Sequence, residues 1–167
     1  MRTNLYFAYG SNLSRAGMAS RCPGAKPLCR ASLGGWRLTF RGVADIEPAP
    51  RRSVLGALWL LGPQDLFRLD RYEGAPSLYE RREVEVATEK GPRLALAYVM
   101  TGDEYLGLPS PHYLRAISRG FRDWGLPPEV LARAVEETAA RLERLGPSGY
   151  RADGAKRLRA VFPPEEE

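Results

Sequence analysis

The sequence predicts an α+β fold in which a small mixed, mainly antiparallel sheet is rolled into a barrel, with helices flanking it. Two observations predict this class. Strand-like runs fill most of the first hundred of the 167 residues, with only two short helical stretches between them. Two longer amphipathic stretches follow residue 109. Because strands that follow one another without a crossover helix tend to pair antiparallel, a doubly wound parallel sheet is disfavoured.

The expected strands are short apolar runs, several with the period-two alternation of a half-buried strand. Gly, Pro and Asp residues separate them, as turns require. The strands are expected at residues 5–9, 28–32, 36–40, 54–60, 83–87 and 93–99. The two short helices between them are expected at about 13–20 and 63–72.

Two amphipathic helices are expected in the last third of the chain. Ser110 is a favoured N-cap and Pro111 suits the first helical position. The second helix follows Pro127-Pro128 and ends at Gly146, after an apolar stripe at one face. The apolar faces contain Leu114, Ile117, Phe121 and Trp124 in the first helix, and Leu131, Val135, Thr138, Leu142 and Leu145 in the second.

Length and composition indicate one domain. A chain that is 44% hydrophobic can bury a sizeable core at this size. We expect one domain over residues 1–145 and a C-terminal tail over 146–167 that mixes Gly, Pro and charge. The sequence contains neither an apolar run of the roughly 18 residues that span a bilayer nor a signal-type N-terminus. We therefore expect a cytoplasmic protein without a membrane partner.

Metal, disulfide and nucleic-acid chemistry are all disfavoured. Cys22 and Cys29 are separated by six residues, and the chain has one His, so neither zinc-ligand spacing nor a disulfide framework is present. The formal charge is +5, which can attract anionic ligands. The arginines are scattered, however, and do not form a nucleic-acid motif with exposed aromatic residues. No metal, cofactor or nucleic-acid partner is expected.

The segment 6–12 has the pattern of an anion site. An apolar strand breaks at Gly10, which can adopt backbone angles closed to other residues, and Ser11 and Asn12 are favoured helix N-caps. Several backbone N–H groups are then expected to point at one place, where a carboxylate or an oxyanion would bind. Many strand-Gly-helix junctions only turn the chain, so the pattern alone is weak.

Glu73 is the second candidate. It shares a helical face with Leu66 and Leu69, and Gly74 ends the helix. Partial burial beside the leucines would raise the pKa of its carboxyl group towards neutrality, as an acid/base requires. The alternative is a surface position in which Asp70 and Glu73 merely balance the neighbouring arginines.

Four segments, in this order, resemble the gamma-glutamylcyclotransferase family. They are Tyr6-Phe-Ala-Tyr-Gly-Ser-Asn-Leu13, Leu69-Asp-Arg-Tyr-Glu-Gly74, Tyr79 at the start of a strand, and Ser110-Pro-His-Tyr113 with Gly125-Leu-Pro127. The resemblance covers about residues 5–130. Asn12 makes the chain less similar to the glutathione-specific members, which have an apolar residue there.

The resemblance implies a cofactor-independent enzyme of acyltransferase or lyase type. Such an enzyme converts a gamma-glutamyl amino acid or gamma-glutamyl amine to 5-oxoproline and the free amine. By resemblance, Glu73 would be the catalytic acid/base. The substrate-binding residues would be Tyr6, Phe7, Ala8, Tyr9, Gly10, Ser11, Tyr79 and Tyr113.

Several alternatives stay open at this stage. The chain could be a non-catalytic protein of the same fold that binds a small acidic metabolite or a protein partner. Ser11 and His112 suggest a serine hydrolase only superficially, because the second glycine of a nucleophile elbow is missing. The sequence does not indicate the leaving amine or the oligomeric state. It also leaves open whether the 6–11 loop holds the substrate's α-carboxylate or the oxyanion.

Overall fold

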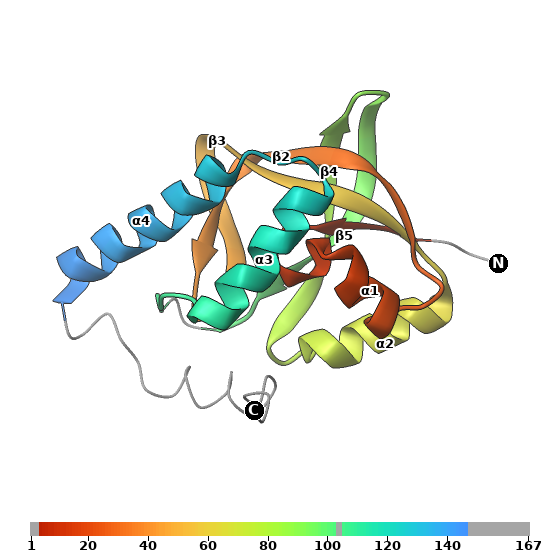
Figure 1. Ribbon diagram of the computed structural model, residues 1–167, viewed down its shortest axis with the longest axis horizontal. Coiled ribbons are helices and arrows are strands. Elements are labelled where there is room, and N and C mark those ends of the chain that lie inside the picture. The colour runs from red at the N-terminus through yellow and green to blue at the C-terminus, as the bar shows by residue number, and fades with distance from the viewer. Residues whose placement is uncertain (1–3, 103–104, 147–167) are drawn as a thin grey trace.

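A computed structural model describes residues 4–102 and 105–146, which form a closed five-stranded barrel with helices outside it (Figure 1). The strands are β1 (Asn4–Ala8), β2 (Lys26–Phe40), β3 (Ala44–Leu61), β4 (Tyr79–Thr88) and β5 (Gly91–Met100). Their order around the barrel is β1-β3-β2-β4-β5. The predicted α+β class and barrel are confirmed.

Strand pairing is mixed and mainly antiparallel. β3 pairs antiparallel with both β1 and β2, and β4 pairs antiparallel with β5. The barrel closes where β1 runs parallel to β5, with Tyr6 opposite Leu96. This closure places the C-terminal end of β1 beside β5, with the loop after β1 continuing into the helices.

The predicted boundaries of β2 and β3 were wrong. The two runs expected at 28–32 and 36–40 form one strand, and a register shift between Gly34 and Trp36 bends it. β3 begins at Ala44, ten residues before its predicted start. Pro48 and Pro50 suggested a loop there, but Pro is tolerated near a bulge, and Pro48 pairs with Trp36 just beyond the register shift.

Four α-helices are present in the described part of the chain, close to where they were expected. They are α1 (Arg15–Arg21), α2 (Pro63–Glu73), α3 (Pro111–Asp123) and α4 (Pro128–Leu145). A short 3₁₀ turn, η1 (Ser11–Leu13), precedes α1. Figure 1 shows α3 crossing the front of the barrel beside α1 and η1. No helix in the described ranges is long and apolar enough to cross a membrane.

Close packing fixes α3 against the segment that follows β1. A Cβ atom on Gly120 would lie 2.5 Å from the Leu13 Cβ atom and 2.9 Å from the Ser14 backbone nitrogen, so only glycine permits this approach. The Trp124 indole N–H donates to the Leu13 carbonyl at 2.8 Å. The C-terminal end of α3 is thereby held against residues 13–14, while its first turn carries Tyr113 close to Gly10.

Candidate active site

One cavity lies where β1, η1, the end of α2 and the start of α3 meet, and it encloses about 330 Å³ including its mouth. Five of its lining residues are tyrosines, one is a carboxylate, and none is Lys or Arg. The lining residues are Tyr6, Tyr9, Gly10, Ser11, Asn12, Ala44, Glu73, Tyr79, Tyr98 and Tyr113. An anionic ligand would therefore be held by hydroxyl and backbone N–H groups.

Glu73 is the last residue of α2, and Gly74 ends the helix in the left-handed conformation at φ 65°. The side chain is 8% exposed, and Leu69 beside it is fully buried. Burial raises the pKa of the Glu73 carboxyl group from 4.5 to about 7, against the lowering effects of the Arg21 charge and the Asn12 hydrogen bond. The carboxyl group can therefore both accept and donate a proton near neutral pH.

Asn12 connects Glu73 to two other side chains. Its amide nitrogen donates to Glu73 Oε1 at 2.7 Å and to the Tyr6 hydroxyl at 3.0 Å. Its amide oxygen accepts from Arg21 Nη1 at 2.9 Å. The Arg21 guanidinium in turn lies 4.3 Å from the centre of the Tyr72 ring. Because Asn12 is 3% exposed, water competes little for these bonds.

Two tyrosines hold the backbone of Ala44 from opposite sides. The Ala44 N–H donates to the Tyr113 hydroxyl oxygen at 3.0 Å, and the Tyr79 hydroxyl donates to the Ala44 carbonyl at 2.8 Å. Ser110 caps α3 by accepting from the Tyr113 backbone N–H at 3.1 Å. The Tyr113 hydroxyl also has a hydrogen bond with the Ser11 side chain, so it connects β3 to the loop after β1.

The two remaining tyrosines link the cavity to α2. The Tyr9 hydroxyl donates to the Tyr98 carbonyl at 2.5 Å, and the Tyr98 hydroxyl donates to Asp70 Oδ1 at 2.6 Å. Arg81 pairs with the same Asp70 oxygen at 3.3 Å. Asp70 therefore orients a lining residue, and the interpretation of Asp70 and Glu73 as charge-balancing surface residues is wrong.

Gly10 adopts φ −122° and ψ −134°, so the expectation of a positive φ was wrong. Glycine provides space there. A Cβ atom would lie 3.0 Å from the Ala44 Cβ atom and 3.5 Å from the Tyr113 hydroxyl. The loop can thus approach β3 and α3 closely while its backbone lines the cavity.

The structure brings seven of the nine predicted site residues to the cavity: Tyr6, Tyr9, Gly10, Ser11, Glu73, Tyr79 and Tyr113. Phe7 and Ala8 do not line it. Both are fully buried, with Phe7 near the Tyr9 ring and both beside Gly56 of β3. Three lining residues were not among those predicted: Asn12, Ala44 and Tyr98. Only Asn12 had a signal, since it lies within the motif.

The described residues contain no group of three or more His, Cys, Asp or Glu side chains arranged to hold a metal ion. Cys22 is buried and Cys29 is exposed, and both are free thiols. Neither lines the cavity.

Comparison with known proteins gives concordant matches. Residues 6–116 match the family model described as gamma-glutamyl cyclotransferase, AIG2-like. Gamma-glutamylcyclotransferase from Homo sapiens is 37% identical over 139 residues, which cover 75% of this chain and 73% of the human one. The Mus musculus protein of the same name is 35% identical over 141 residues, with 76% and 74% coverage. A solved structure named gamma-glutamyl cyclotransferase superposes with a TM-score of 0.73 at 28% identity, covering 95% of this chain and 99% of the other.

Proposed function

The chain belongs to the gamma-glutamyl cyclotransferase, AIG2-like family, and from that premise we propose how it converts a gamma-glutamyl amino acid or gamma-glutamyl amine into 5-oxoproline and the free amine. Glu73 acts as the general acid/base. The observation that carries this assignment is a buried carboxyl group with a pKa of about 7 that shares a cavity with the Tyr9–Ser11 loop.

The substrate contains both reacting groups. Its α-amino nitrogen attacks its own γ-carbonyl carbon, and a five-membered ring forms. The cavity's main task is therefore to hold the reactive conformer, which can lower the barrier by several kcal/mol. The lining of tyrosine, serine, asparagine and glutamate side chains suits a compact, polar glutamyl group.

Glu73 moves the protons that this ring closure requires. The carboxylate takes a proton from the α-ammonium group, and the free amine then forms the new C–N bond. In the tetrahedral intermediate Glu73 returns this proton to the departing amide nitrogen, and it takes the second proton from the ring nitrogen as the amide C–N bond breaks. It then passes the second proton to the released amine. Both protons end on the leaving amine, so Glu73 ends in its starting state.

Neutral donors hold the negative charges of the substrate and the intermediate. Burial raises the pKa of the Tyr6, Tyr9, Tyr79 and Tyr113 hydroxyls, so they stay protonated at neutral pH. The Tyr113 hydroxyl and the backbone N–H groups of the loop are donors to the α-carboxylate and to the developing oxyanion. Preorganised donors among buried residues stabilise charge more than water-exposed ones do.

A binding protein without activity is the weaker alternative. Such a protein needs the anion-binding loop but has no use for a buried carboxyl group with a near-neutral pKa. Glu73 faces the cavity together with the loop, which favours the enzyme. A nucleic-acid binder has no support from this cavity.

The test is a product assay over a panel of gamma-glutamyl amino acids and gamma-glutamyl amines, with 5-oxoproline and the released amine quantified. We expect the two products in equal amounts from at least one member. Saturable binding of the panel without 5-oxoproline would instead identify a binding protein.

A further inference from the structure

The proposed reaction needs the Glu73 carboxylate to present one oxygen to the substrate throughout the cycle. Glu73 is the last residue of α2, so no following helical turn restrains its side chain. The restraint comes from α1 and η1 instead, through two hydrogen bonds: Arg21 donates to Asn12, and Asn12 donates to Glu73.

The hydrogen-bonding groups of Arg21 and Glu73 fix the orientation of the Asn12 side-chain amide. A guanidinium has only donors, so Arg21 fixes the Asn12 amide oxygen towards itself. The Asn12 amide nitrogen must then point the other way, where it donates to Glu73 Oε1 at 2.7 Å and to Tyr6 at 3.0 Å. The Glu73 carboxylate and the Tyr6 hydroxyl favour the same orientation from the other side, so the amide is fixed at both ends.

Arg21 is itself fixed by the residue next to Glu73. Its guanidinium stacks at 4.3 Å on the ring of Tyr72, and such stacking is favourable for a planar cation. α1 therefore holds the end of α2 at two adjacent positions, one through Tyr72 and one through Glu73.

We propose that Arg21 and Asn12 are positioning residues that hold Glu73 in a single orientation, with Oε1 bound to Asn12 and Oε2 presented to the substrate amine. This inference rests on the proposed function of Glu73. It assigns roles to two side chains that transfer no proton, and it makes Arg21 the source of the positive charge nearest to the reacting carboxyl group.

Arg21 is the charged group that matters among the titratable groups facing Glu73. The groups on the surrounding elements are Tyr6 and Tyr9, Arg21, Cys22, Tyr79, Tyr98 and Tyr113. Burial raises the pKa of each of these tyrosines and of Cys22, whose pKa is about 11, so they are neutral near pH 7. The Arg21 charge lowers the pKa of Glu73, and removing that charge must raise it.

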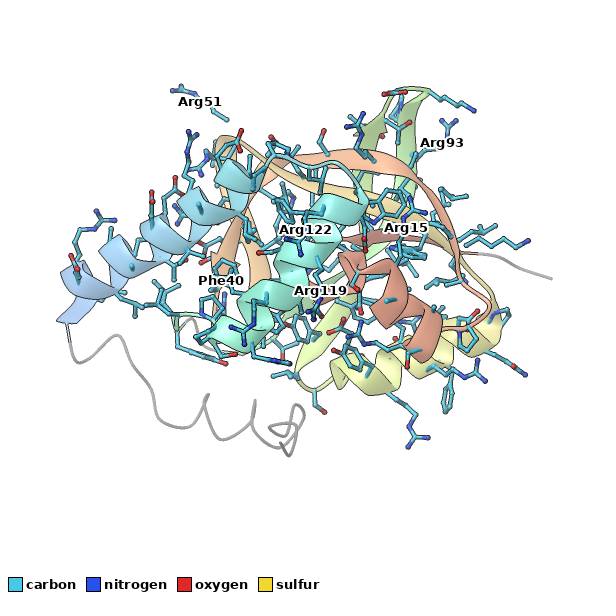
Figure 2. The ribbon with its side chains drawn as sticks, viewed as in Figure 1. Arg15, Phe40, Arg51, Arg93, Arg119 and Arg122 are labelled. Carbon is cyan, nitrogen blue, oxygen red and sulfur yellow. The ribbon has the colours of Figure 1, made fainter. Side chains whose placement is uncertain are left out.

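The experiment compares the pH dependence of kcat/KM in wild type, Arg21→Gln and Arg15→Gln. The control is closely matched, because Arg15 lies on the same helix (Figure 2). Its guanidinium also stacks on a ring at 4.3 Å, that of Trp124. Arg15 is exposed and contacts neither Asn12 nor Glu73. We expect Arg21→Gln to move the acidic limb upward by roughly 1 pH unit, with recovery at pH 9, and Arg15→Gln to leave the limb in place.

Asn12 provides a second, independent variant. Asn12→Asp places a second carboxyl group against Glu73 Oε1, so the two share a proton and the acidic limb again moves upward. Asn12→Ala should lower kcat roughly 10-fold or more with a smaller change in KM. Adding Arg21→Gln to it should lower kcat little further at pH 9, where the pKa shift caused by the lost charge no longer matters.

The outcomes separate the inference from the function on which it rests. Wild type that forms no 5-oxoproline overturns the proposed function. Active wild type whose acidic limb is unmoved in folded Arg21→Gln, or in Asn12→Asp should the former not fold, overturns the inference. NMR titration of the Glu73 side-chain carboxyl carbon in wild type and Arg21→Gln reads the same shift without any turnover.

Discussion

Glu73 occupies a position at which two physical effects act in the same direction. It lies at the C-terminal end of α2, where the helix dipole disfavours a negative charge, and it is almost completely buried. Both effects favour the protonated form, and the Arg21 charge and the Asn12 hydrogen bond oppose them. The resulting pKa of about 7 suits a group that must accept a proton in one step and return it in the next.

Asp70 supports the site through Tyr98. Asp70→Asn keeps an acceptor for the Tyr98 hydroxyl but loses the charge and the Arg81 pair. Hydrogen bonds to charged groups exceed neutral ones by about 1 kcal/mol, so we expect KM for the gamma-glutamyl substrate to rise by about 5-fold. Glu85→Gln, the same charge change at an exposed position of β4, should leave KM unaltered. Equal kinetics for the two variants would contradict this role for Asp70.

Residue-level prediction from sequence named seven residues that line the cavity, but Phe7 and Ala8 of the same motif do not line it. Glu73 shares a face with leucines and precedes a helix-ending glycine, and this pattern predicted its burial. Tyr98 and Ala44 could not be found in that way. Tyr98 reaches the cavity because β5 closes the barrel beside β1, and Ala44 because β3 begins far earlier than its apolar pattern suggested. Both depend on pairing between distant segments.

At the scale of elements, the loop after β1 is held in place because α3 approaches η1 closely at Gly120, which has no side chain. Gly120→Ala would place a Cβ atom 2.5 Å from the Leu13 Cβ atom and push α3 away. Overpacking of this kind costs typically 1–3 kcal/mol, and displacement of α3 moves Tyr113. We expect a lower midpoint in denaturant unfolding together with a higher KM.

Gly34 provides the control for Gly120. A Cβ atom there would meet nothing within 4 Å, so Gly34→Ala should change the unfolding midpoint little. A Gly120→Ala variant as stable as Gly34→Ala would show that α3 does not need this close approach.

The elements themselves were largely predictable, because caps and periodicity are local. Ser110 caps α3, and Gly74 and Gly146 follow the helices that they end. The long β2–β3 hairpin was not predictable to the same degree. Its polar and Pro-containing part resembles a loop, and it is a strand only because β2 pairs with it beyond the register shift.

At the scale of the whole molecule, positive charge is spread rather than concentrated at the cavity. Figure 2 shows Arg51, Arg93, Arg119 and Arg122 on three separate elements, β3, β5 and α3. None of these arginines lines the cavity. A net charge of +5 then acts as a diffuse field that favours the approach of anionic substrates.

Burying Glu73 lowers the stability of the folded protein at neutral pH. The pKa of Glu73 is about 7 in the folded state and 4.5 ordinarily, so between these values the folded state binds more protons than the unfolded state. The free energy of unfolding therefore falls as pH rises through this window, by up to about 3 kcal/mol for this group. Glu73→Gln has no carboxyl group to titrate at this position. Its free energy of unfolding, relative to that of wild type, should therefore increase from pH 5 to pH 8.

Denaturant unfolding of both proteins across that range checks the stability difference, since all other titrating groups cancel in the comparison. A difference that is constant with pH would mean that Glu73 ionises in the folded state as it does in solvent.

The most direct measurement is 5-oxoproline formation by Glu73→Gln compared with wild type, on the best substrate of the panel and with substrate binding measured in parallel. Gln preserves the shape and can still accept the Asn12 hydrogen bond, but it cannot transfer a proton. We predict that substrate still binds while kcat falls by about 10²–10⁴-fold, the usual contribution of a general acid/base. Turnover by a folded Glu73→Gln variant within a few-fold of wild type would contradict the assignment of Glu73 as the acid/base.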